Sequence, residues 1–93
     1  MMENILSILQ ERGYSEKQSV KVAAELQGID DSLKNHLNKW LVSEEESDYH
    51  VVGFSLLELK RKFDMTYPAA LLTMDWLIKD SENAIRSINR GIK

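Results

Sequence analysis

Apolar residues recur along the chain at helical spacing and predict a series of short helices. In the clearest stripe, Leu33, Leu37, Trp40 and Leu41 fall at i, i+4, i+7 and i+8, while charged and amide side chains occupy the other face. Shorter stripes predict helices over residues 4–12, 15–28, 55–63 and 66–78, and a last helix from about residue 81. The pattern as a whole therefore favours an all-α protein.

Capping residues mark where these helices begin. Ser15 is followed by Gln18 and Ser55 by Glu58, at the spacing of the reciprocal capping box. Other starts are assigned to Asp30 or Asp31, to Thr66 or Tyr67, and to Asp80 or Ser81. Gly13 and Gly28 are placed to end the first two helices.

Two segments depart from the amphipathic pattern. Residues 69–78 are apolar nearly all round, which predicts a central helix covered by its neighbours or by a partner subunit. Residues 43–52 crowd acids and keep no stripe, so we expect a solvated connection with a short extended piece at 49–52. The prediction is a compact single-domain bundle of about five to six short helices, with an N-terminal three-helix layer (1–42), an acidic connection (43–52) and a C-terminal three-helix layer (53–93).

The two halves of the chain contain short segments of similar sequence. KWLVSEEE at 39–46 resembles DWLIKDSE at 75–82, and GYS at 13–15 resembles GFS at 53–55. A degenerate two-fold internal repeat would explain this likeness, and so would the shared packing needs of short amphipathic helices. We favour the second explanation, because a branched apolar residue beside Trp-Leu is common in helical cores.

Composition narrows the possible functions. The 93 residues carry 12 Lys and Arg against 15 Asp and Glu, and they include no cysteine, so disulfides, thiolate nucleophiles and cysteine zinc sites are excluded. The chain has no apolar run long enough to span a membrane and no signal peptide at its start, so a cytoplasmic location without membrane contact is expected. The strongest basic cluster is short: Lys60, Arg61 and Lys62.

The sequence contains few candidates for catalytic, metal-binding or phosphate-binding residues. His36 lies one helical turn before Trp40, and His50 lies in the acidic connection, but neither has the partners of a catalytic or metal motif. The acidic run lacks the ligand spacing of a calcium loop, and the glycines form no phosphate-binding loop. We therefore expect no catalytic residues, no metal and no cofactor.

Residues 54–80, FSLLELKRKFDMTYPAALLTMDWLIKD, resemble a helix-turn-helix of the winged-helix kind. The packing positions of this resemblance are Ser55, Leu59, Phe63, Met65, Ala70 and Leu77. It implies DNA binding, with Lys60, Arg61 and Lys62 as candidate phosphate contacts. The second helix departs from the family because it presents no basic residue before Lys79, and a further helix stands where a wing would follow.

The N-terminal part resembles another family. ERGYSEKQSVKVAAEL at 11–26, followed by LNKWL at 37–41, is similar to the ubiquitin-associated type of three-helix module. That resemblance implies a binding patch at Gly13, Tyr14 and the end of the third helix. The stretch from Gly13 to Trp40 is longer than the family pattern, so an ordinary helical layer is the alternative.

We therefore predict a small helical interaction module that contacts another protein or a second copy of itself. A DNA-binding helix-turn-helix regulator is the alternative, although nucleic acid is not the expected partner. Aromatic residues near helix ends and loops either anchor the core or anchor an interface. The candidate interface residues are Tyr14, Trp40, Tyr49, Phe54, Tyr67 and Trp76.

Overall fold

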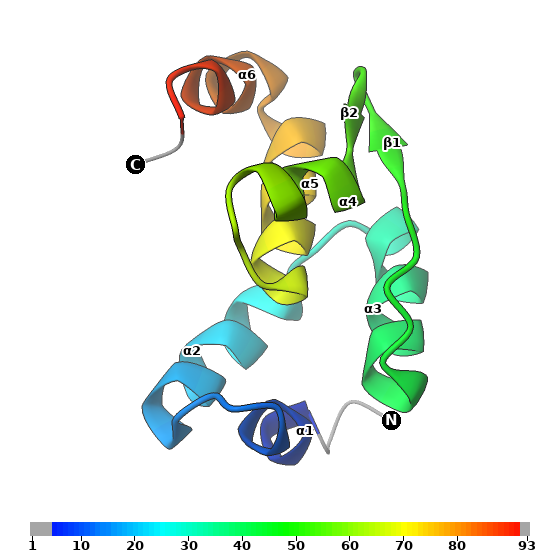
Figure 1. Cartoon of the computed structure of the whole chain (residues 1–93), viewed down its shortest axis with the longest axis vertical. Helices are drawn as coiled ribbons and strands as arrows, with labels where there is room; N and C mark the ends of the chain where they lie inside the picture. Colours follow the sequence, from blue (N-terminus) through cyan, green and yellow to red (C-terminus); the bar gives the residue numbers. More distant parts are fainter. Residues whose placement is uncertain (1–4, 92–93) are drawn as a thin grey trace.

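The computed structural model describes residues 5–91, which form six helices and one two-stranded hairpin (Figure 1). In chain order the elements are α1 (Ile5–Glu11), α2 (Glu16–Leu26), α3 (Asp31–Ser43), β1 (His50–Val51), β2 (Phe54–Ser55), α4 (Leu56–Lys62), α5 (Tyr67–Lys79) and α6 (Ser81–Asn89). The predicted all-α class is confirmed. No helix within the described range is long and apolar enough to cross a membrane.

Helix α5 lies at the centre of the fold. Helices α4 and α6 pack most closely on it, and α2, α3 and β1 also contact it. Its side chains Ala70, Leu71, Met74 and Leu77 have no exposed surface. An apolar helix must be covered on most sides, so the central position predicted for residues 69–78 is confirmed.

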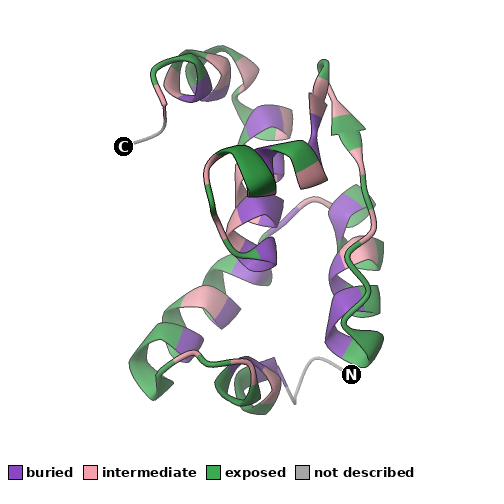
Figure 2. Ribbon diagram, viewed as in Figure 1, coloured by how far each residue is buried: buried purple, intermediate pink, exposed green. Residues whose placement is uncertain are grey.

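The core continues from α5 into the faces that the other helices turn toward it (Figure 2). All four residues of the predicted α3 stripe are buried. The remaining buried apolar residues outside α3 and α5 are Ile5, Leu9, Ala23, Leu26, Ile29, Leu56, Leu59, Ala84 and Ile88.

Most of the predicted helix starts are confirmed by hydrogen bonds. Ser15 forms the full capping box with Gln18, and the two bonds are each 3.1 Å long. Asp30 caps α3 and Thr66 caps α5 through their side chains, whereas Asp80 makes no side-chain capping bond to α6. The predicted start of the first helix, at residue 4, lies outside the described residues.

The two halves of the chain are built differently. Helix α4 packs closely on α5, whereas α2 and α3 lie on different sides of the molecule and each packs on α5 (Figure 1). Within residues 5–42, α1 packs on α2, and Arg12 after α1 donates a hydrogen bond to the Trp40 carbonyl of α3. Gly13, with φ +102°, follows the end of a helix, whereas Gly53, with φ +84°, lies in the hairpin turn. These differences favour shared packing needs over a duplication.

The hairpin is the element that the sequence predicted least well. The extended piece expected at 49–52 is confirmed in part as β1. Ser55 is the N-cap of α4, as predicted, but Phe54–Ser55 also pairs with β1 as a second strand, which the sequence pattern did not indicate. Val51 pairs with Phe54 and His50 with Ser55, which leaves Val52 and Gly53 as a two-residue turn.

Candidate functional site

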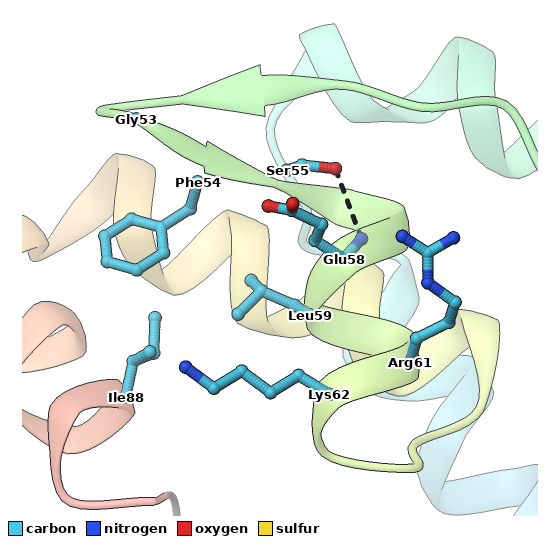
Figure 3. A pocket seen from close by; sticks show the side chains of 8 residues that line it. All are labelled: Gly53, Phe54, Ser55, Glu58, Leu59, Arg61, Lys62 and Ile88. Atoms are coloured by element: carbon cyan, nitrogen blue, oxygen red, sulfur yellow. Dashed lines mark hydrogen bonds between the residues drawn. The ribbon is translucent and has the colours of Figure 1, made fainter.

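A groove of about 520 Å³ lies between the hairpin, α4 and α6, and we call it the hairpin groove (Figure 3). The side chains of Phe54, Leu59 and Ile88 point toward one another and form its apolar floor. The charged side chains Glu58, Arg61 and Lys62 line it as well, and Lys62 extends toward Ile88. Gly53 and Ser55 complete the lining. The groove can therefore bind an apolar group and a charged group together.

Asp48 fixes the hairpin at the start of α4. Its carboxylate accepts hydrogen bonds from the backbone N–H of Tyr49 at 2.8 Å, from the backbone N–H of Leu57 at 3.1 Å and from the Ser55 hydroxyl at 2.9 Å. Ser55 in turn accepts a bond of 3.2 Å from the Glu58 backbone N–H. The Asp48 side chain thus holds the hairpin against the start of α4, and both of these elements line the groove.

The capping box predicted for Ser55 and Glu58 is only half formed. Ser55 accepts the expected bond from the Glu58 backbone, but the reciprocal bond from Ser55 N–H to the Glu58 carboxylate is not found between these two described residues. The Asp48 carboxylate supplies a second acceptor at this helix start instead. Glu58 consequently keeps its carboxylate beside the groove (Figure 3).

Among the residues proposed to contact phosphate, Lys60 differs from the other two. Lys60 forms an ion pair of 3.0 Å with Glu46, from the acidic connection. Arg61 and Lys62 are exposed, and within residues 5–91 neither has an ion-pair partner. Both residues line the hairpin groove, Lys62 with its side chain extended toward Ile88 and Arg61 with its guanidinium turned away from Ile88 (Figure 3).

A second recess, of about 420 Å³, lies where the end of α3 meets the turn between α4 and α5. The Arg12 guanidinium lies 4.5 Å from the centroid of the Trp40 ring and donates a bond of 2.9 Å to the Trp40 carbonyl. Arg12 also pairs with Glu44 at 3.1 Å. Tyr67 stacks on Trp40 and donates its hydroxyl proton to the Ser47 carbonyl at 2.9 Å. These internal contacts give the recess a structural role.

The six candidate interface aromatics occupy different environments. Trp40 and Tyr67 are core residues, with 5% and 1% of their surface exposed. Tyr14, Tyr49 and Phe54 are partly buried, and the buried Tyr14 hydroxyl has no hydrogen-bond partner among residues 5–91. Trp76 is exposed at 38%. Phe54 is the member of this set that lines the hairpin groove.

The two histidines differ: His50 is exposed, with Nε2 3.7 Å from the Asp48 carboxylate, whereas His36 takes part in contacts within the fold. His36 Nδ1 lies 2.7 Å from the Ser47 hydroxyl, and its ring lies 5.0 Å from that of Tyr49. Desolvation by burial, with a smaller effect of Lys39, lowers the pKa of His36 from 6.5. Among residues 5–91, no group of three or more His, Cys, Asp or Glu side chains is arranged to hold a metal ion.

We expect Asp48 to make the stability of the fold sensitive to acid. Desolvation by burial raises its pKa, but its hydrogen bonds outweigh that effect, so the pKa lies below 3.8. A carboxylate with a depressed folded pKa stabilises the fold above its unfolded pKa, and this stabilisation is lost as pH falls through the folded pKa. Urea unfolding at several pH values should show a smaller loss of stability below about pH 4 for Asp48→Asn than for the wild type.

Part of the acid effect should remain in that variant. Asp30 also has a lowered pKa, because it accepts hydrogen bonds from the side chain and backbone of Ser32. Identical pH dependence of the wild type and Asp48→Asn would show that Asp48 does not titrate as its contacts indicate.

Sequence reasoning did not bring the hairpin groove together. In the sequence, Phe54 is a candidate interface aromatic, Arg61 and Lys62 are candidate phosphate contacts, and Leu59 is a packing position. No local signal connects α6, which contributes Ile88, to the hairpin. Their meeting depends on how α4 and α6 pack on α5. Comparison with known proteins finds no family model, no curated protein and no solved structure that matches the chain.

Proposed function

We propose that this protein is a non-catalytic interaction module that binds an acidic, amphipathic segment of another protein in the hairpin groove. The observation that carries the proposal is the combination of an apolar floor with two basic side chains, Arg61 and Lys62, that have no ion-pair partner within residues 5–91. A segment with carboxylates beside large apolar side chains would complement both features.

The chain itself provides an example of this recognition. Glu46, from the acidic connection, already pairs with Lys60 of the same basic cluster. An acidic partner would extend this pairing to Arg61 and Lys62, while its apolar side chains cover Phe54, Leu59 and Ile88. Eight residues line the groove, fewer than the roughly 20–30 residues that each partner contributes to a stable protein interface, so we expect weak, reversible binding with a Kd of about micromolar order.

The contacts of α5 favour a protein partner over DNA. A recognition helix places its first turns against base edges in the major groove. The first turn of α5 instead buries Tyr67 and Pro68 in the core. Lys60, one of the three candidate phosphate contacts, is paired inside the chain. DNA binding would therefore have to rely on Arg61 and Lys62, without a recognition helix that contacts the bases.

A random peptide library displayed on phage and selected on the full chain tests the proposal. Selected peptides should be enriched in Asp and Glu interspersed with large apolar residues, and labelled peptides should bind in fluorescence anisotropy with an affinity that falls as salt rises. In a spectrum of the ¹⁵N-labelled protein they should shift the amide signals of Phe54, Leu59 and Ile88. A library that yields no binders, or binders without acidic enrichment, would contradict the proposal.

The double variant Arg61→Glu with Lys62→Glu should lower the affinity for selected peptides by at least about tenfold, because it replaces attraction with repulsion. The matched control is Lys17→Glu with Lys21→Glu, which makes the same change of charge at two exposed positions on α2. The control should bind within about twofold of the wild type. Equal losses in the two double variants would indicate a general charge effect and no specific groove.

Two further measurements distinguish other partners. Sedimentation shows whether the chain associates with itself. If it forms a dimer that the double variant at Arg61 and Lys62 disrupts, a second copy of the chain occupies the groove, and the proposal of a different protein as partner fails. A mobility shift of duplex DNA at low salt, lost in the same variant, would favour the helix-turn-helix alternative.

A further inference from the structure

The hairpin turn next to the groove has an unusual residue in it. Val52 and Gly53 are the two turn residues, and both have positive φ, at +42° and +84°. Positive φ at both central residues is the requirement of a type I′ hairpin turn, which strongly prefers Asn, Asp or Gly at the first of them. Val52 is therefore a poor choice for this backbone position.

Val52 does not gain stability from packing that would offset the strain. A β-branched residue in the left-handed region is a genuine outlier because its side chain crowds the backbone. The Val52 side chain is also 56% exposed and lies outside the core and the residues packed against it. A single exposed valine is ordinary, but an exposed valine in a strained conformation has no explanation within the fold.

We propose that Val52 is an apolar contact for the bound segment at the end of the hairpin groove. This inference rests on the proposed function. Gly53 and Phe54 follow Val52 in the chain, and both of them line the groove (Figure 3). A segment lying on Phe54 that continues past Gly53 would cover Val52. Strained residues gather at binding sites, where the strain is part of function.

The hairpin is positioned firmly enough for this role. Its base is tied to α4 by the three bonds that Asp48 accepts, and the Tyr49 carbonyl accepts a bond of 2.8 Å from the Leu56 backbone N–H. The turn is therefore presented at a fixed place relative to Leu59 and Arg61. A preorganised contact adds affinity because little freedom is lost on binding.

The variant Val52→Asn distinguishes a role of Val52 in peptide binding from a role in the stability of the fold. Asparagine is the residue that a type I′ turn prefers before glycine, so the variant should raise the Tm by about 4–8 °C. The same variant should weaken binding of the library-selected peptides about fivefold or more, because it removes an apolar contact. A gain in stability together with a loss of affinity is a result that a purely structural role of Val52 would not give.

Val20→Asn is the matched control. Val20 is 55% exposed, nearly the same as Val52, but it lies in α2 and lines neither the hairpin groove nor the second recess. This variant should leave both the Tm and the peptide affinity close to the wild-type values. It measures how the loss of an exposed valine outside the hairpin turn and the groove changes the Tm and the peptide affinity.

The outcomes distinguish this inference from the proposed function. If Val52→Asn binds selected peptides like the wild type while the double variant at Arg61 and Lys62 does not, the groove binds peptides without Val52 and the inference fails. If the double variant also binds like the wild type, the proposed function fails. A lower Tm for Val52→Asn would show that the valine supports the fold, which also overturns the inference.

Discussion

Replacing Trp40 with alanine is expected to lower the free energy of unfolding by about 3–5 kcal/mol, a large part of the stability of a domain of this size. Trp40 is 5% exposed, its ring centroid lies 6.1 Å from that of Tyr67, and the Arg12 guanidinium covers its ring. The variant loses the buried surface and both ring contacts. Urea unfolding followed by far-ultraviolet circular dichroism measures the change, and Trp40→Phe gives a smaller, measurable loss if the alanine variant does not fold.

The second tryptophan supplies the control for this experiment. Trp76 is 38% exposed on α5, so Trp76→Ala should cost clearly less than Trp40→Ala, about 1–2 kcal/mol. A loss from Trp76→Ala as large as that from Trp40→Ala would mean that the exposed face of α5 is covered in solution, for example by a second copy. Sedimentation of the wild type would then show an oligomer.

Replacing Asp48 with alanine should lower the free energy of unfolding by about 1–3 kcal/mol. The change leaves the backbone N–H groups of Tyr49 and Leu57, and the Ser55 hydroxyl, without the acceptor that they share. Urea unfolding of the two proteins at neutral pH measures the loss. The amide signals of Val51 and Phe54 should shift as well, because the hairpin is no longer tied to α4.

Glu45→Ala is the control for Asp48→Ala. Glu45 lies in the same acidic connection and is exposed, and its side chain makes no hydrogen bond or ion pair within residues 5–91. Its removal should change stability by less than about 0.5 kcal/mol. Similar losses from the two variants would attribute the effect to the net charge of the connection and not to the contacts of Asp48.

The helices could be predicted from sequence because their determinants are local. Ser15, Asp30 and Thr66 each cap a helix through a bond to a backbone group two or three residues along the chain. The stripe of α3 has the spacing of a single helical face, so its burial follows from its sequence alone. Such features need no knowledge of what the helix packs against.

Burial on α5 could not be predicted in the same way. Residues 69–78 are apolar nearly all round, so the sequence does not indicate which side the neighbours leave uncovered. The structure exposes Trp76 on that side, while Trp40 of the amphipathic helix is buried. The hairpin escaped prediction for a related reason, since each strand has two residues and the turn places valine where asparagine is usual.

The central position of α5 has a consequence for the order of folding. Helices α2 and α3 precede α5 in the chain but pack on it, whereas α4 and α6 are its neighbours in sequence. During synthesis from the N-terminus, α2 and α3 leave the ribosome before α5, the helix on which they pack. We expect α4, α5 and α6 to associate first, through contacts of short sequence separation, and the earlier helices to dock afterwards.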